Sequence, residues 1–131
     1  MRTRTQQLHA YVWGQHRIKG RLGLGDALRH NETTHVPTKI TAGNIDWVQI
    51  ASGPYHMVGL SRNGEVFTWG SGWCGKLGHG DYKERDVPRK VQYLSNERIV
   101  KVACGDQHTA ALAAGGKLFT WYVIKTPSDY I

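Results

Sequence analysis

The sequence has few of the residues that would identify a secreted, membrane or metal-binding protein. Its 131 residues include only two cysteines, Cys74 and Cys104, and their spacing is unlike that of metal ligands. So few cysteines fit a reducing compartment, and we expect a cytoplasmic or nuclear location. No apolar run is long enough to cross a bilayer, so we expect no membrane insertion.

Acidic residues are also scarce. Ten Asp and Glu stand against 17 Lys and Arg, which gives a formal net charge of +7 at pH 7. This balance attracts acidic or phosphate-rich partners over a long range, so nucleic acid or chromatin is one candidate partner. The basic residues are spread along the chain, with short clusters only at 17–21 and 85–90, which is more typical of an ordinary solvated surface.

Convincing helical periodicity is absent, and proline occurs only four times, whereas glycine occurs 16 times. Short extended runs separated by glycine are typical of β-strands joined by tight turns. The sequence therefore predicts an all-β fold.

Two stretches of the chain, residues 50–69 and 102–121, are near-copies of each other. His56 and His108 lie 52 positions apart, and Trp69 and Trp121 repeat the same offset. A fixed period near fifty residues is the signature of a repeat architecture, in which each unit needs its neighbours to bury its apolar face.

Each repeat divides into about four short strands, which is the make-up of one propeller blade. The strands we expect are at 46–52, 56–60, 65–69, 98–104, 108–112 and 117–121. Asn63-Gly64 and Gly115-Gly116 stand between successive runs and predict hairpin turns. The first run of each repeat is apolar on both faces, which indicates a strand covered on both sides. Val36-Pro37 and Val87-Pro88 suit the start of a strand or an edge strand.

The order of motifs resembles the regulator of chromosome condensation family of seven-bladed β-propellers. The motifs are Trp-Gly, then Gly-x-Leu-Gly-x-Gly-Asp, Pro, Val-Ala-Cys-Gly-x-x-His-Thr-x-x-Leu and Gly-x-Leu-Phe-Thr-Trp. The resemblance covers residues 11–121, which leaves 1–10 as an N-terminal extension and 122–131 as a divergent tail without the next glycine-rich loop. We expect two consecutive four-stranded blades of an incomplete ring. The chain is then a fragment, a short isoform or a subunit that needs other chains or missing blades to close the ring.

This resemblance implies a non-catalytic scaffold that binds a protein partner. The alternative is guanine-nucleotide exchange on a small Ran-like GTPase, for which family members use an acidic residue and a histidine at the Gly-x-x-His turns. Here Tyr55 and Gln107 directly precede the histidines, which argues against exchange activity. No nucleophile stands beside a base, so we expect no catalytic residue, no cofactor and no metal. The candidate partner-binding residues are Asp106, His108, Tyr55 and Trp73.

Other recurring residues are interpreted as structural. The tryptophans that recur in register should form the core between blades, and they are Trp13, Trp69 and Trp121. His56 should fix its own turn by bonding backbone groups, Gly53 and Gly105 should end strands, and Asp26 and Asp81 should cap the glycine-rich turns. Because two units leave apolar faces and strand edges uncovered, we expect the isolated chain to be oligomeric or poorly folded.

Overall fold

The computed structural model describes residues 6–15, 21–25, 33–40 and 42–122. Within these ranges the chain is all-β, with two single-turn 3-10 segments, η2 (Trp73–Gly75) and η3 (Gln92–Leu94). The strands are β1 (Tyr11–Gln15), β2 (Thr33–Lys39), β3 (Trp47–Ser52), β4 (His56–Ser61), β5 (Val66–Gly70), β6 (Arg85–Lys90), β7 (Ile99–Cys104), β8 (Thr109–Ala113) and β9 (Leu118–Trp121).

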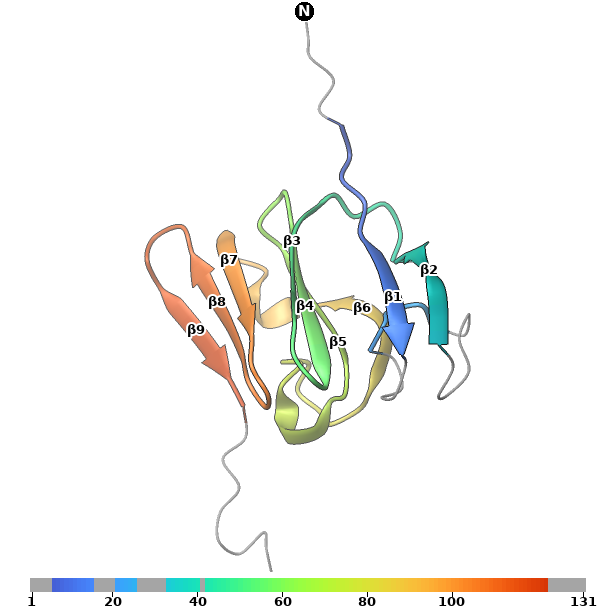
Figure 1. Ribbon diagram of the computed structural model, residues 1–131. Coiled ribbons are helices and arrows are strands. Elements are labelled where there is room, and N and C mark those ends of the chain that lie inside the picture. Colours follow the sequence, from blue (N-terminus) through green and yellow to red (C-terminus); the bar gives the residue numbers. More distant parts are fainter. Residues whose placement is uncertain (1–5, 16–20, 26–32, 41, 123–131) are drawn as a thin grey trace, which may run out of the picture.

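These strands form three antiparallel sheets that lie side by side (Figure 1). The first sheet is β1-β2, the central sheet is β3-β4-β5-β6 and the third sheet is β7-β8-β9. The all-β, partial-propeller prediction is confirmed, and the structure adds the position of the blade boundaries. The sequence repeat starts at the Trp-Gly pair, which lies on the third strand of a blade. The described chain therefore holds the last two strands of one blade, one complete blade and the first three strands of the next.

The hairpins form where the sequence predicts them. Gly64 and Gly116 both have positive φ angles, of 81° and 91°, which a glycine adopts without the steric cost that a side chain would add. Each sits in the tight turn of a hairpin, β4–β5 and β8–β9 respectively. Pro88 lies in β6, the last strand of the central sheet, where its missing N–H costs no ladder hydrogen bond.

The prediction that 46–52 and 98–104 are covered on both faces is wrong. These segments form β3 and β7, and each lies at the edge of its sheet. Val48 and Val100 are 44% and 49% exposed. The fully buried strand is β4, all of whose residues are buried, because it has a strand on either side and a sheet against it. Apolar composition alone does not distinguish these two positions.

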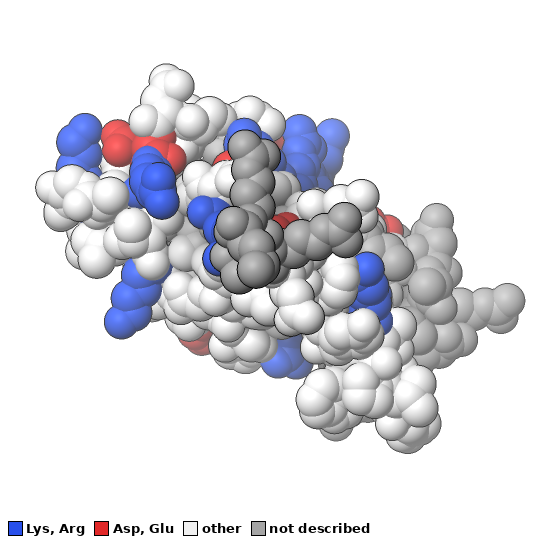
Figure 2. Space-filling model, turned by 90° about the horizontal axis from the view of Figure 1, so that it is seen from above, with Lys and Arg blue, Asp and Glu red and all other residues white. Residues whose placement is uncertain are grey.

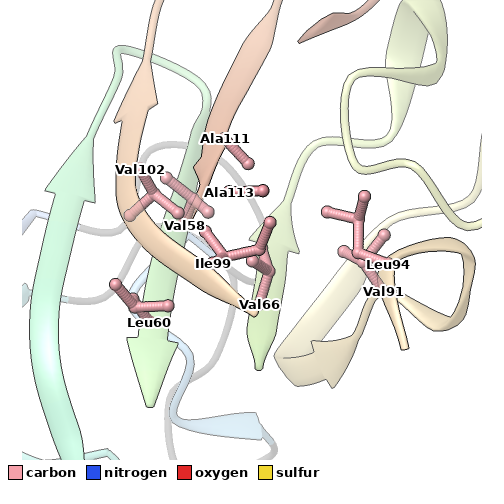
Figure 3. Packing of buried hydrophobic residues seen from close by; sticks show 9 residues of the cluster. All are labelled: Val58, Leu60, Val66, Val91, Leu94, Ile99, Val102, Ala111 and Ala113. Carbon is pink, nitrogen blue, oxygen red and sulfur yellow. The ribbon is translucent and has the colours of Figure 1, made fainter. Parts of the chain in front are cut away.

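Two hydrophobic clusters hold the three sheets together. Between the first and central sheets, buried Trp47 contacts Phe67 edge-on, with 5.4 Å between ring centroids, and also contacts Trp69. The second cluster joins the central and third sheets, and its side chains point toward one another from both sides (Figure 3). Its buried members are Val58, Leu60, Val66, Val91, Leu94, Ile99, Val102, Ala111 and Ala113. Each buried Val, Leu or Ile contributes about 1.5–3 kcal/mol of hydrophobic free energy.

The recurring tryptophans pack on the glycine-rich loop of the preceding repeat. Trp69 is fully buried, and its Nε1 donates a 3.1 Å hydrogen bond to the carbonyl of Arg21. A Cβ on Gly23 would lie 2.8 Å from that Nε1, so only glycine fits beneath the ring. The Trp121 ring lies over Gly78 in the same way, since a Cβ there would lie 2.7 Å from its Nε1, but this Nε1 has no hydrogen-bond partner among the described residues. Trp13 is 62% exposed, so in the described structure it does not take the predicted place in the core.

Candidate functional site

Three connections gather at one end of the sheets, the lower end in Figure 1. They are the β3–β4 turn, the segment around η2 and the β7–β8 turn. We call the surface formed by residues 53–55, 71–76 and 105–108 the loop face. All four residues predicted to bind a partner lie on it: Tyr55, Trp73, Asp106 and His108.

Lys76 is the centre of the loop face. The residue is only 1% exposed, and its Nζ donates a 3.0 Å hydrogen bond to Oε1 of Gln107. The same Nζ lies 5.4 Å from the centroid of the Tyr55 ring and 5.8 Å from that of the Trp73 ring. Both distances fit cation–π attraction. Tyr55 and Trp73 are 39% and 51% exposed, so the two rings cover a buried ammonium and also face solvent.

The charge of Lys76 is poorly matched by the groups around it. Burial lowers the pKa of its ammonium, and Cys74, Asp106 and Cys104 offset part of that effect. Among the described residues, no ion pair includes Lys76. An ammonium has three donors, and the Gln107 amide accepts one of them. The interior of the loop face is therefore positive beneath its aromatic rings.

His56 supports the loop face from the interior, between the central and third sheets. It is fully buried, and its Nε2 lies 2.8 Å from Oγ1 of Thr109 on the third sheet. The Thr109 hydroxyl donates a 2.6 Å hydrogen bond to the carbonyl of Lys76, so it must accept from the N–H at Nε2. Burial, with the nearby charges of Lys76 and His108, lowers the pKa of His56 to about 4. The neutral ring thus links two sheets, instead of fixing only its own turn as the sequence analysis predicts.

Cys104 and His56 resemble a nucleophile and its base, since Sγ lies 3.2 Å from Nε2. Burial raises the pKa of the Cys104 thiol to about 11 and lowers that of the imidazole, so both groups are neutral. A protonated thiol is a poor nucleophile. The thiol instead points to the carbonyl of His56, at 3.3 Å. The pair acts as part of the packing between sheets.

His108 occupies the position of His56 in the next repeat, but it is exposed. In the described ranges no further sheet lies beyond the third to supply a hydroxyl like that of Thr109. His108 instead lines a hollow of about 280 Å³ together with Gln107, Thr120 and Tyr122. Asp106 is exposed beside it on the same turn. These two side chains are available to an incoming group.

The two turn glycines allow the loop face to close up. A Cβ on Gly53 would lie 2.4 Å from the carbonyl oxygen of Gly105, and one on Gly105 would overlap the His108 ring.

Asp81 accepts a 3.0 Å hydrogen bond from the backbone N–H of Lys83 and forms an ion pair with Arg85 at 2.7 Å. Asp26, its predicted counterpart, lies outside the described residues.

The comparisons with known proteins identify the family. The regulator of chromosome condensation (RCC1) repeat matches residues 9–60 and 63–112, and a second form of the repeat matches residues 47–76. This chain belongs to the RCC1 repeat family. The human E3 ubiquitin-protein ligase HERC2 is 42% identical over 105 residues, which cover 78% of this chain and 2% of HERC2. The ultraviolet-B receptor UVR8 of Arabidopsis thaliana is 35% identical over 120 residues, which cover 91% of this chain and 26% of UVR8.

Solved structures share the same fold. Human WBSCR16 aligns with a TM-score of 0.77 and 26% identity, over 94% of this chain and 31% of WBSCR16. Prp20p of Saccharomyces cerevisiae, described with its binding properties to Gsp1p and histones, aligns with a TM-score of 0.74 and 21% identity. That alignment covers 90% of this chain and 30% of Prp20p. The chain thus spans less than a third of each of these relatives.

The part of this RCC1-type chain that the structure describes meets the requirements neither of a metal site nor of a membrane-spanning helix. In the described ranges, no group of three or more His, Cys, Asp or Glu side chains could hold a metal ion. None of the helical segments described is long and apolar enough to span a bilayer. The face opposite the loop face carries Lys and Arg side chains that are spread out and interspersed with acidic ones (Figure 2). Ion pairs among the described residues include Arg62–Asp46, Lys90–Glu65 and Lys117–Glu97.

The sequence analysis predicts the exposed residues of the loop face but not the buried lysine at its centre. Lys76, Gln107 and Thr109 were not predicted to take part. One signal was available for Lys76, because the first glycine-rich loop also has a cation, Arg21, at the same position of the Gly-x-Leu-Gly motif. No sequence pattern showed that Gln107 and Thr109 would reach it from the next sheet.

Proposed function

We propose that this chain is a non-catalytic protein-binding module and that the loop face is the surface that contacts the partner. The observation that carries this proposal is the arrangement of Tyr55 and Trp73, two half-exposed aromatic rings stacked over the buried ammonium of Lys76. Aromatic residues on rigid supports are the side chains that most often dominate the binding energy of protein interfaces.

The support beneath the rings favours binding. Lys76 is fixed by Gln107, and its carbonyl is fixed by Thr109 and His56, so the central and third sheets hold the loop face together. A surface already ordered before binding loses less conformational entropy when a partner docks. The positive interior of the loop face favours a partner with acidic or carbonyl groups at the contact.

Site-specific photocrosslinking tests the proposal. A photoreactive phenylalanine analogue is placed at Trp73 or, as a control of matched exposure, at Val100 on β7; the two residues are 51% and 49% exposed. We expect a discrete adduct from position 73 and none from position 100. The crosslinked protein is then purified, and its affinity for the unmodified chain is measured by calorimetry.

Alanine variants complete the test. Trp73→Ala should weaken the affinity about 30-fold or more, as for a central interface aromatic, whereas Val100→Ala should change it less than about threefold. Circular dichroism checks that both variants fold. Equal crosslinking at the two positions, or equal affinities of the two variants, would contradict the role of the loop face.

Two further assays separate the other predicted roles. Release of labelled GDP from a panel of small GTPases tests guanine-nucleotide exchange, and an acceleration that Asp106→Ala removes would favour exchange over simple binding. Titration of duplex DNA at several salt concentrations tests chromatin contact. An affinity that falls steeply with salt would favour it, because phosphate contacts release counterions.

A further inference from the structure

The strand β6 at the outer edge of the central sheet is irregular, and the irregularity brings two arginines together. Arg89 is opposite Thr68 on β5 and Arg85 is opposite Gly70, so four steps along β6 match only two along β5. A bulge of this kind moves extra residues out of the ladder. The two arginines therefore start about 7 Å apart along the sheet, instead of the roughly 13 Å that a regular strand would give.

The first sheet shows where side chains at these two positions point. β2 has the same irregularity, between Thr34 and Thr38. These threonines precede Arg85 and Arg89 by the same 51 positions. Their Oγ1 atoms lie 3.1 Å apart, and each lies 3.0 Å from the carbonyl oxygen of Val36. The bulge thus directs both side chains to one place, and in β6 both of these side chains are arginine.

His79 of the glycine-rich loop lies beside the two arginines. Its Nε2 is 2.9 Å from Oγ1 of Thr68, the residue opposite Arg89 in the ladder. Burial lowers the pKa of the His79 imidazole, and the positive charges of Arg85 and Arg89 lower it further. Both guanidinium groups are therefore close to the same ring.

We call His79, Asp81, Lys83, Arg85 and Arg89 the arginine cluster. Asp81 pairs with Arg85 at 2.7 Å, but Nε of Arg85 is buried and has no hydrogen-bond partner among the described residues. Arg89 is exposed, and its side chain makes no hydrogen bond or ion pair in the described ranges. Lys83 is exposed on the same loop as Asp81. A buried donor without a partner is typical of a place that holds an ion or water. The cluster has more positive than negative charge, and its donors are only partly used.

The arrangement suits one phosphate group. Adjacent guanidinium groups donate charge-assisted hydrogen bonds to several oxygens of the same phosphate. A phosphorylated serine or threonine offers three such oxygens and a charge of about −1.5 to −2. A nucleic-acid backbone would need a longer row of cations. Glu84 and Asp86 stand on either side of Arg85 and would repel the neighbouring phosphates of such a backbone.

We propose that the arginine cluster binds a phosphorylated serine or threonine side chain of a protein partner, with Arg85 and Arg89 holding the phosphate oxygens. The cluster adjoins the loop face, because a Cβ on Gly72 beside η2 would overlap the carbonyl group of Lys83. One partner can therefore contact both. This site is additional to the proposed function, and a small phosphate compound tests it separately from binding at the loop face.

A titration followed by NMR tests the site in the full chain. The Nε–H signals of Arg85 and Arg89 are the reporters, and that of the exposed Arg98 is the internal control. The probe is N-acetyl-O-phosphoserine amide, and the amides of N-acetylserine and N-acetylglutamate are compared with it. We expect saturable shifts at Arg85 and Arg89 but not at Arg98. The affinity for phosphoserine should exceed that for glutamate about tenfold or more.

Substitution of Arg89 tests the assignment of the phosphate contacts. Arg89→Thr introduces the residue type found at the equivalent position of β2, and circular dichroism checks that the variant folds. We expect it to bind phosphoserine about tenfold or more weakly, whereas Arg98→Thr, the matched control, should bind it as before. Equal affinities of the two variants, or equal affinities for phosphoserine and glutamate, would overturn the proposal. Duplex DNA that displaces the probe at a lower phosphate concentration would overturn it in favour of nucleic acid.

Discussion

Nε2 of His56 on the central sheet lies 2.8 Å from Oγ1 of Thr109 on the third sheet, and both residues are fully buried. The Thr109 hydroxyl in turn donates a 2.6 Å hydrogen bond to the carbonyl of Lys76. A single hydroxyl therefore connects the core between two sheets to the ammonium-bearing residue of the loop face. This connection makes the inter-sheet contact and the proposed binding surface parts of one structural unit.

Thr109→Val tests the contribution of that hydroxyl. Valine has nearly the same shape, but it leaves the His56 Nε2 and the Lys76 carbonyl without their partner. Leaving buried polar groups unpaired should lower the free energy of unfolding by about 1–3 kcal/mol. Urea unfolding measures the change, and Thr120→Val on the exposed side of β9 is the matched control. Equal midpoints for the two variants would show that the buried contact adds nothing.

The depressed pKa of His56 predicts how stability depends on pH. Its pKa is about 4 in the folded state and 6.5 in the unfolded chain. Between these two pH values the unfolded state therefore binds a proton at His56 and the folded state does not. The free energy of unfolding should fall as pH drops from about 6.5 to about 4, by up to about 3 kcal/mol, and then level off. Burial also lowers the pKa of His79, which acts in the same direction.

Urea unfolding at a series of pH values measures this dependence, and His56→Gln should flatten it. The carboxyl groups of Asp46 and Asp81, held by Arg62 and Arg85, have lowered pKa values and act in a different range. Their contribution is complete above the ordinary value of 3.8 and is lost only below it. An unchanged slope between pH 4 and 6.5 in the His56 variant would contradict the assignment.

The strands and hairpins could be predicted from the sequence because their causes are local. Asn63-Gly64 specifies a tight turn by its backbone preferences, and the flanking runs supply the paired strands. The packing of Trp69 and Trp121 on glycines follows from the repeat itself. The local sequence pattern is sufficient to predict such packing where the adjacent repeat is also present in the chain.

The rest depends on contacts between repeats. Trp13 carries the same sequence signal as Trp69, but it is exposed in the described structure, whereas Trp69 is fully buried against the glycine-rich loop. From the sequence alone, Lys76 would be taken for an ordinary surface lysine. It is buried because Tyr55 and Gln107 approach it from other turns. The boundary between blades before Trp47 is likewise set by strand pairing. The repeat period gives the length of a blade but does not show at which strand the blade begins.

Gly23→Ala should show the importance of the close packing between a glycine-rich loop and Trp69. Gly23 has a φ angle of +71°, and its added Cβ would lie 2.8 Å from the Trp69 Nε1. Gly43 is the matched control, with a φ angle of +68° and nothing within 4 Å of the added Cβ. Both changes incur about 1 kcal/mol of backbone strain, so the excess loss in Gly23→Ala measures the packing. We expect an excess of about 1–3 kcal/mol in thermal or urea unfolding, and equal losses would contradict it.

Trp13→Ser should reduce self-association of the chain. Trp13 is 62% exposed on the first sheet, and Tyr11 and Val36 on the same sheet are 53% and 65% exposed. An exposed apolar patch at the end of a row of sheets favours docking of another apolar surface. Sedimentation velocity over a range of protein concentrations measures the shift toward monomer. Trp73→Ser, which removes an equally large ring from the loop face, is the control and should leave the association unchanged. If the wild-type chain sediments as a monomer with a cooperative melt, or if the two variants behave alike, the first sheet does not mediate association.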